Sequence, residues 1–145
     1  MDDEEARQIA AWRYEPPYSF YDADADAGDL AMLLGRESRE GRYFSAFSGD
    51  ALVGFFEFKC DGDDVVIGLG LRPDLTGRGL GLPFLEAGMA FARERFRPSR
   101  FRLSVATFNE RAIRVYERAG FLPLRTYDHE TAGALHPFLE MTRPG

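Results

Sequence analysis

The chain has 145 residues, of which 45% are hydrophobic and 29% are charged. This balance is typical of one folded domain, so it argues against a disordered chain and against two full-sized domains. The net charge is −6 and no basic stripe is present, which argues against nucleic-acid binding, because phosphate neutralisation supplies most of that affinity. We therefore treat residues 1–145 as a single domain.

Cysteine content and hydropathy exclude further classes of protein. Cys60 is the only cysteine, so an intrachain disulfide and a cysteine-based metal cluster are both excluded. Residues 2–5 are acidic where a signal peptide would be basic, and no apolar run approaches the roughly 18 residues that span a bilayer. We expect a cytoplasmic protein with no membrane partner.

The N-terminal part is predicted to be helical and aromatic. Acidic residues in a first turn predict a helix over Asp3–Trp12, which must end before Pro16-Pro17. An irregular aromatic segment over residues 14–21 comes next, followed by a short helix over Asp29–Leu34.

Three consecutive strands are predicted in the middle of the chain, over Tyr43–Phe47, Ala51–Lys59 and Val65–Leu71. Turns rich in glycine and aspartate separate them. The third strand is apolar throughout, so we expect it to lie centrally in a sheet with both faces covered.

Helices and strands alternate in the remainder. Helical periodicity and strand-forming runs predict a helix over Leu82–Phe96, a strand over Phe101–Val105, a helix over Asn109–Ala119, and strands near Leu122–Tyr127 and Pro137–Thr142. This order predicts one α+β domain in which helices cover a sheet.

A glycine-rich turn, Gly77-Arg78-Gly79-Leu80-Gly81, lies between the apolar strand and the helix that begins at Leu82. Alternate glycines permit positive φ and close approach of the backbone, so that successive N–H groups can converge on one anion. The helix N-terminus adds unpaired N–H groups and partial positive charge, and Arg78 adds a cation. The turn therefore predicts a pyrophosphate site.

Two other phosphate-binding motifs do not fit this turn. A P-loop ends in Gly-Lys-Ser/Thr, whereas Leu82-Pro83 follows Gly81 here. A dinucleotide fingerprint that begins at Gly79 would need a small residue where Phe84 stands. A tight turn without a ligand is the remaining alternative.

The turn resembles the pyrophosphate loop of the GNAT superfamily of N-acetyltransferases, Gln/Arg-x-x-Gly-x-Gly/Ala after an apolar-x-Pro strand end. The matching residues are Leu71-Arg72-Pro73 and Thr76 to Gly81, with Thr76 in place of Gln or Arg. This departure removes one long polar side chain near the cofactor and leaves the backbone amides and Arg78.

A second block strengthens the resemblance. Asn109, Ala112, Tyr116-Glu117 and Gly120-Phe121 stand where GNAT proteins carry Asn-x-x-Ala-x-x-x-Tyr-Glu-x-x-Gly-Phe. The two motifs occur in the family's order, and the resemblance covers about residues 43–127. It implies a GNAT fold, with a central, mixed, mostly antiparallel sheet flanked by helices. Because the chain opens almost directly in a helix, we expect either that the first strand of that fold is missing or that the chain starts late.

The resemblance implies a role for each part of the two motifs. Residues Leu69, Gly70, Leu71, Gly77, Arg78, Gly79, Leu80, Gly81, Leu82, Asn109 and Tyr116 would contact acetyl-CoA, a co-substrate, with no metal needed. Asn109 would either cap its helix or bind the pantetheine arm. Tyr116, two helical turns on, would donate a proton to the departing thiolate. A half-buried core tyrosine is the structural alternative for Tyr116.

The general base is less clearly marked. Ser104 stands where the ribosomal-protein branch of the family carries a glutamate. Glu57 is the leading substitute, because it interrupts an apolar strand where an unpaired charge would be costly, and an ion-paired strand residue is the alternative. Glu140 is a weaker candidate. His129 and His136 are expected in a tail loop, as surface residues.

The acceptor site is predicted from aromatic and acidic residues near the N-terminus. Tyr18 and Tyr21 are the candidate substrate-binding residues. Asp22, Asp24 and Asp26 could attract an amine, or they could simply cap and solvate a turn, and both readings stay open.

Transfer of acetyl from acetyl-CoA to a primary amine, of a small molecule or a protein N-terminus, is the leading functional hypothesis. The alternatives are a GNAT-fold module that binds CoA without turnover, and transfer of a longer acyl group. A missing edge strand would leave a sheet edge unpaired, so a homodimer is also an expectation.

Overall fold

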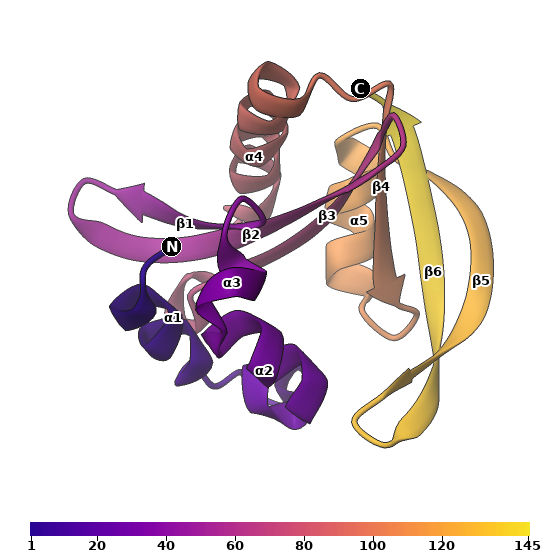
Figure 1. Ribbon diagram of the computed structural model, residues 1–145. Coiled ribbons are helices and arrows are strands. Elements are labelled where there is room, and N and C mark those ends of the chain that lie inside the picture. Colours follow the sequence, from indigo (N-terminus) through magenta and orange to yellow (C-terminus); the bar gives the residue numbers. More distant parts are fainter.

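A six-stranded sheet forms the centre of the fold in the computed structural model, which describes residues 1–145 (Figure 1). The strands lie in the order β1-β2-β3-β4-β6-β5, and only β3 and β4 run parallel. Their bounds are β1 Tyr43–Ser48, β2 Ala51–Asp61, β3 Asp64–Leu71, β4 Arg100–Ala106, β5 Leu122–Thr131 and β6 Ala134–Pro144. The α+β fold with a mixed, mostly antiparallel sheet, as predicted from the sequence, is confirmed.

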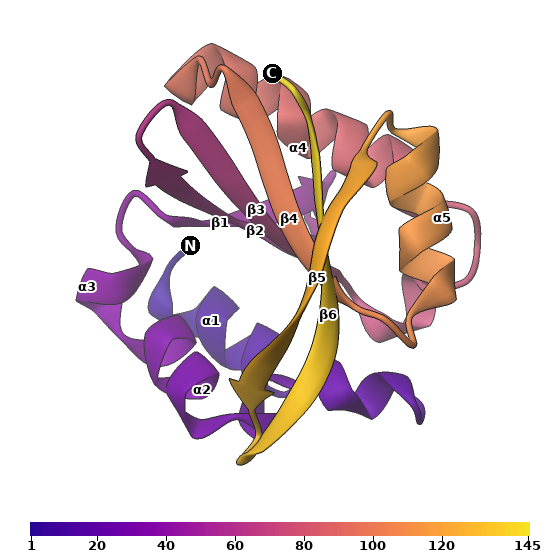
Figure 2. The ribbon, with the colours of Figure 1, turned by 90° about the vertical axis from the view of Figure 1, so that its right-hand side faces the viewer.

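Helices cover both faces of the sheet (Figure 2). The α-helices are α1 Asp3–Ala10, α2 Ala27–Leu34, α3 Arg36–Arg39, α4 Gly81–Phe96 and α5 Glu110–Arg118, and three short 3-10 turns are η1 Tyr18–Tyr21, η2 Ala23–Ala25 and η3 Pro73–Leu75. No strand precedes α1 in the described chain. No helix has the length and apolar character needed to cross a membrane.

The main core lies between the sheet and the helices α4 and α5. Leu85 and Met89 of α4 are almost completely buried against Phe58 of β2 and Leu103 of β4. This agrees with the apolar stripe predicted for α4 from its helical periodicity. A smaller core, centred on Ile9, joins α1 and α2 to the other face of the sheet.

The parallel pairing of β3 with β4 is short, and this opens the sheet. It covers only Asp64–Val66 and Arg100–Arg102, after which β3 continues to Leu71 without a partner on that side. Over the same stretch β4 stays paired with β6 as far as Ala106. The two central strands therefore diverge in a V towards the glycine turn.

Several helix boundaries differ from those predicted. The first helix ends at Ala10 rather than Trp12, and Asp2 caps its N-terminus in a capping box with Glu5. The second begins at Ala27, because Asp26 accepts a hydrogen bond from the backbone N–H of Asp29 and acts as its N-cap. The four-residue helix α3 was not predicted.

The expectation that His129 and His136 lie in a tail loop is wrong. They lie on β5 and β6 and are directly opposite each other in the hairpin. The turn that joins these strands contains Ala132 and Gly133, both with positive φ. Because alanine rarely adopts that conformation, Ala132-Gly133 is only a weak turn signal.

Candidate active site

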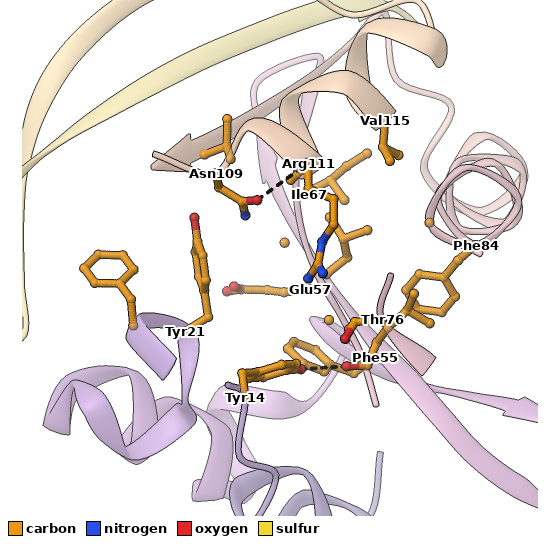
Figure 3. A pocket seen from close by; sticks show the side chains of 18 of the residues that line it. Tyr14, Tyr21, Phe55, Glu57, Ile67, Thr76, Phe84, Asn109, Arg111 and Val115 are labelled. Atoms are coloured by element: carbon orange, nitrogen blue, oxygen red, sulfur yellow. Dashed lines mark hydrogen bonds between the residues drawn. The ribbon is translucent and has the colours of Figure 1, made fainter. Parts of the chain in front are cut away.

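One cavity of about 730 Å³ fills the opening of the V and extends to the N-terminal segment (Figure 3). The glycine turn and α5 border one end, and α2, the η1–η2 segment and the β5–β6 hairpin border the other. Asn109, Tyr21 and Glu57 point towards the space between the two ends.

The glycine turn has the backbone geometry of an anion cradle. Gly77 and Gly79 adopt positive φ, as predicted, with values of 72° and 76°. A Cβ on Gly79 would meet no atom within 4 Å, so the space beside this residue of the turn is open. No side chain caps the N-terminus of α4, which leaves its first N–H groups for a ligand.

Gly81 has a different role from its two neighbours. It is the first residue of α4, and a Cβ there would lie 3.2 Å from a methyl group of Val115. The missing side chain therefore lets α4 and α5 approach closely at the rim of the cavity.

The diverging part of β3 presents a row of backbone groups to the cavity. The Arg72 N–H donates to the Val53 carbonyl at 2.8 Å, which fixes the hydrogen-bonding phase of β3 against β2. Antiparallel pairing alternates, so the N–H and C=O groups of Leu69 and Leu71 face away from β2, where β4 has diverged. Gly70 lies between them, where a Cβ would come within 2.4 Å of the Phe55 ring.

Helix α5 brings Asn109 and Tyr116 to the cavity. The Asn109 Oδ1 accepts a hydrogen bond from the Ala112 N–H at 3.1 Å, so Asn109 is the N-cap of α5, one of the two roles considered from the sequence. Tyr116 lines the cavity two turns further on. Burial raises the pKa of the Tyr116 phenol well above its ordinary value, so the hydroxyl is protonated at neutral pH.

Tyr21 reaches the same region from the N-terminal segment. Its hydroxyl accepts a hydrogen bond from the Ala106 N–H, at the end of β4, over 3.2 Å. Burial raises the pKa of Tyr21, and the neighbouring Asn109 amide partly opposes that rise. Three polar groups, on Tyr21, Asn109 and Tyr116, therefore meet where the V opens.

Glu57 projects from β2 into the cavity. Its carboxylate pairs with the Arg42 guanidinium and keeps 25% of its side-chain surface exposed. A Cβ on Gly68 would lie 3.3 Å from a Glu57 carboxylate oxygen, so the glycine on the neighbouring strand makes room for this group. Glu57 is thus both an ion-paired strand residue and a carboxylate inside the cavity, the two alternatives considered for it from the sequence.

Most of the residues predicted for the site share this cavity. Those that line it are Tyr21, Glu57, Leu69, Gly70, Leu71, Gly77, Gly79, Gly81, Leu82, Asn109 and Tyr116. Three do not line it, namely Tyr18, Arg78 and Leu80. Tyr18 instead lies against the Arg111 guanidinium, 4.1 Å from ring centroid to Cζ.

Sequence reasoning missed the arginines of α5. Arg111, Arg114 and Arg118 all line the cavity, and Arg111 lies beside Gly77, 3.4 Å from where a Cβ would stand. Their spacing of three and four residues, which places side chains on one helix face, was a signal that could have been used. Glu140, the weaker candidate base, is buried between Arg102 and Arg125 and does not line the cavity.

The model of the acetyltransferase (GNAT) family matches residues 4–121. A mycothiol acetyltransferase from Propionibacterium freudenreichii is 39% identical over 80 residues, which is 52% of this chain and 25% of the relative, so the chain spans about a quarter of that protein. The chain therefore belongs to the GNAT family of acetyltransferases, as the resemblance of the two motifs implied.

Solved structures share the fold. A spermidine N-acetyltransferase SpeG chimera from Vibrio cholerae and hSSAT superimposes with a TM-score of 0.79 at 16% identity, covering 99% of this chain and 92% of that one. The protein yncA from Salmonella typhimurium, solved with its cofactor acetyl-CoA, gives a TM-score of 0.63 at 20% identity over 80% of this chain and 73% of that one. At these identities the likeness concerns the fold alone.

Proposed function

We propose that this protein is an acetyl-CoA-dependent N-acetyltransferase that passes the acetyl group directly to a primary amine. The observation that carries the proposal is the continuity of one cavity, from the glycine turn, past the unpaired edge of β3, to Tyr116 and Glu57. This arrangement lets two substrates meet inside the V.

The CoA end matches the chemistry of its ligand. The backbone amides of Gly77 and Gly79, with the uncapped N-terminus of α4, would hold the pyrophosphate. Arg111 would supply positive charge beside it, and Arg78 would contribute from the outer side of the turn. The backbone groups of Leu69 and the N–H of Leu71 would hydrogen-bond the pantetheine amides and the acetyl carbonyl, whereas the Leu71 carbonyl already accepts from the Tyr14 hydroxyl.

The reactive end offers an acid and a base. When bound, acetyl-CoA supplies an activated acetyl group, and transfer forms a C–N bond as the C–S bond breaks. Tyr116, which burial keeps protonated, would donate its proton to the leaving sulfur. Glu57 would accept the proton lost by the amine, directly or through a water molecule. Asn109 and Tyr21 would orient the two groups.

The acceptor would enter from the end bordered by Tyr21, with Tyr18 nearby at the outer rim. An amine is supported by the acidic residues of that end, which favour a cationic ligand. The name of one protein of similar fold, a spermidine N-acetyltransferase, points the same way. A small-molecule amine and a peptide N-terminus are the two candidate acceptors.

Free thiol release and mass spectrometry of the product would test the proposal. The protein, acetyl-CoA and a panel of primary amines and short peptides should give thiol together with an N-acetylated product. Measured CoA binding without thiol release above background would contradict the transferase proposal and favour a CoA-binding module. Faster turnover with succinyl-CoA than with acetyl-CoA would favour transfer of a longer acyl group.

A further inference from the structure

We infer that the acceptor is a small amine that carries a second positive charge, held by Asp29, and that a peptide N-terminus is not the acceptor. This inference rests on the proposed function and specifies the acceptor class for the same cavity. Three features support this inference. Tyrosine hydroxyls occupy backbone groups on β3 and β4, hydrogen bonds join the N-terminal segment to the β5–β6 hairpin at the far end of the cavity, and Asp29 carries an unpaired charge.

Two tyrosines occupy backbone groups that an extended peptide would need. A peptide commonly binds beside a strand by pairing with its free N–H and C=O groups. On β3 the Tyr14 hydroxyl donates to the Leu71 carbonyl at 2.7 Å, and on β4 the Tyr21 hydroxyl accepts from the Ala106 N–H. Burial raises the pKa of Tyr14 to about 12, which keeps it a donor. One backbone group on each arm of the V is therefore unavailable for pairing with a peptide.

Hydrogen bonds of Asp26 join the start of α2 to the β5–β6 hairpin at the far end of the cavity. One oxygen of Asp26 caps α2, and the other accepts from the Ala132 N–H at 2.8 Å, in the tip of the β5–β6 hairpin. Phe20 adds aromatic contacts to the same hairpin, with ring centroids 4.9 Å from His136 and 6.1 Å from Phe138. A polypeptide chain that extended beyond its reacting N-terminus would meet this wall.

Asp29 is the carboxylate of this end that lacks a protein partner. Glu57 is paired with Arg42, Asp26 accepts the hairpin N–H, and Asp22 accepts the Tyr14 N–H at 2.9 Å. The Asp29 side chain lines the cavity and takes part in no ion pair or hydrogen bond of the structure.

The surroundings of Asp29 favour a cation. Partial burial, and then the neighbouring charges of Asp26 and Glu57, raise the pKa of its carboxyl group, and the nearby His129 partly opposes that rise. A bound ammonium would relieve the repulsion between the carboxylates. The first turn of α2 favours an acid at this position, but it leaves the carboxylate oxygens unbonded.

The charges within the cavity are separated by position. The three lining arginines are on α5, where Arg111 lies beside Gly77. The lining carboxylates are on the η1–η2 segment, α2 and β2, and His129 of the hairpin is the remaining basic side chain of the lining. An acceptor with one neutral, reacting amine and one ammonium group would place the ammonium at Asp29. A monoamine would leave Asp29 uncompensated.

The experiment compares three acceptors of similar reactivity, 1,4-diaminobutane, butylamine and a peptide with a free N-terminal alanine. We expect kcat/KM for the diamine to exceed that for butylamine by about tenfold or more, the usual contribution of a charge-assisted hydrogen bond, and the peptide to react least. Asp29→Asn should bring the diamine-to-monoamine ratio close to one. The control Asp50→Asn, an exposed acid in the β1–β2 turn, should leave the ratio unchanged.

Calorimetric titration of the CoA complex with 1,4-diaminobutane provides a readout that does not depend on turnover, and Asp29→Asn should weaken this binding by a similar factor. The inference is overturned if the peptide is the best acceptor, or if Asp29→Asn lowers the diamine and monoamine rates equally. If CoA binds and none of the three acceptors is acetylated, the proposed function itself fails, and the inference with it.

Discussion

The two ends of the cavity differ in whether backbone groups or side chains form them. The proposed CoA end is made of backbone groups, in the glycine turn and along β3, with arginines at its border. The acceptor end is made of side chains, hydroxyls and carboxylates whose positions depend on hydrogen bonds between distant segments. A backbone site tolerates many side-chain changes, whereas a side-chain site can change its ligand by single substitutions. This difference explains how one fold can keep its cofactor while its acceptors vary.

The first prediction concerns the point where the two ends meet. Tyr116→Phe should lower kcat by about 100-fold or more, the usual contribution of a general acid, because it removes the proton donor for the leaving sulfur. The Kd for CoA should stay within about twofold, since the lost hydroxyl belongs to the chemical step rather than to binding of the cofactor. Stopped-flow or steady-state thiol release together with a CoA titration would measure both. An unchanged kcat would remove Tyr116 from this role.

The pH dependence tests the same group. A general acid must be protonated, and burial raises the pKa of Tyr116 above its ordinary value. The alkaline limb of the kcat profile should therefore fall only above pH of about 10, the ordinary tyrosine pKa. A fall near pH 8 that persists in Tyr116→Phe would assign the acid to another group.

The second prediction tests the backbone end. Gly79→Val should weaken CoA binding by about 100-fold, the equivalent of two charge-assisted hydrogen bonds, because φ is 76° at Gly79 and a β-branched residue would distort the turn. Gly49→Val is the matched control, since Gly49 also has positive φ, at 59°, with open space around it, but lies in the β1–β2 turn. Equal losses of CoA affinity in both variants would indicate general damage to the fold.

The third prediction concerns the arginines at the border. Arg111→Gln should weaken CoA binding by about tenfold at low salt, and by less at high salt, because screening reduces the contribution of an exposed charge. Arg7→Gln, an exposed arginine of α1 that pairs with Glu4, serves as the control. A salt-independent effect in Arg111→Gln would argue that Arg111 acts through its contact with Tyr18 instead.

The fourth prediction separates folding from function. A Cβ on Gly88 of α4 would come within 2.2 Å of the Phe56 ring in the main core. Gly88→Ala should therefore lower the free energy of unfolding by about 1–3 kcal/mol, through overpacking, with kcat/KM within about twofold at 25 °C. Chemical denaturation would measure the first and thiol release the second. A large loss of activity in a folded variant would show that the main core transmits strain to the site.

The difference between the two ends also explains what could be predicted from the sequence. The glycine turn and the Asn109–Phe121 block are each contiguous in the sequence, so residue spacing was enough to predict the order of strands and helices around them and to select residues that share one cavity. The acceptor end depends on contacts such as Tyr21 with Ala106 and Asp26 with Ala132, whose members are 85 and 106 residues apart in the chain. Residue patterns do not contain such pairings, which is why Asp29 and the hairpin histidines were missed.

Titration of the backbone amide NMR signals would test most directly whether one cavity has a CoA end and a separate acceptor end. Addition of CoA should shift the amides of Leu69, Gly77, Gly79 and Gly81, and leave those of Asp29 and Ala132 in place. Subsequent addition of 1,4-diaminobutane should shift Asp29 and Ala132. The account would be contradicted if CoA first perturbed the signals near Asp29 and left the glycine turn unchanged.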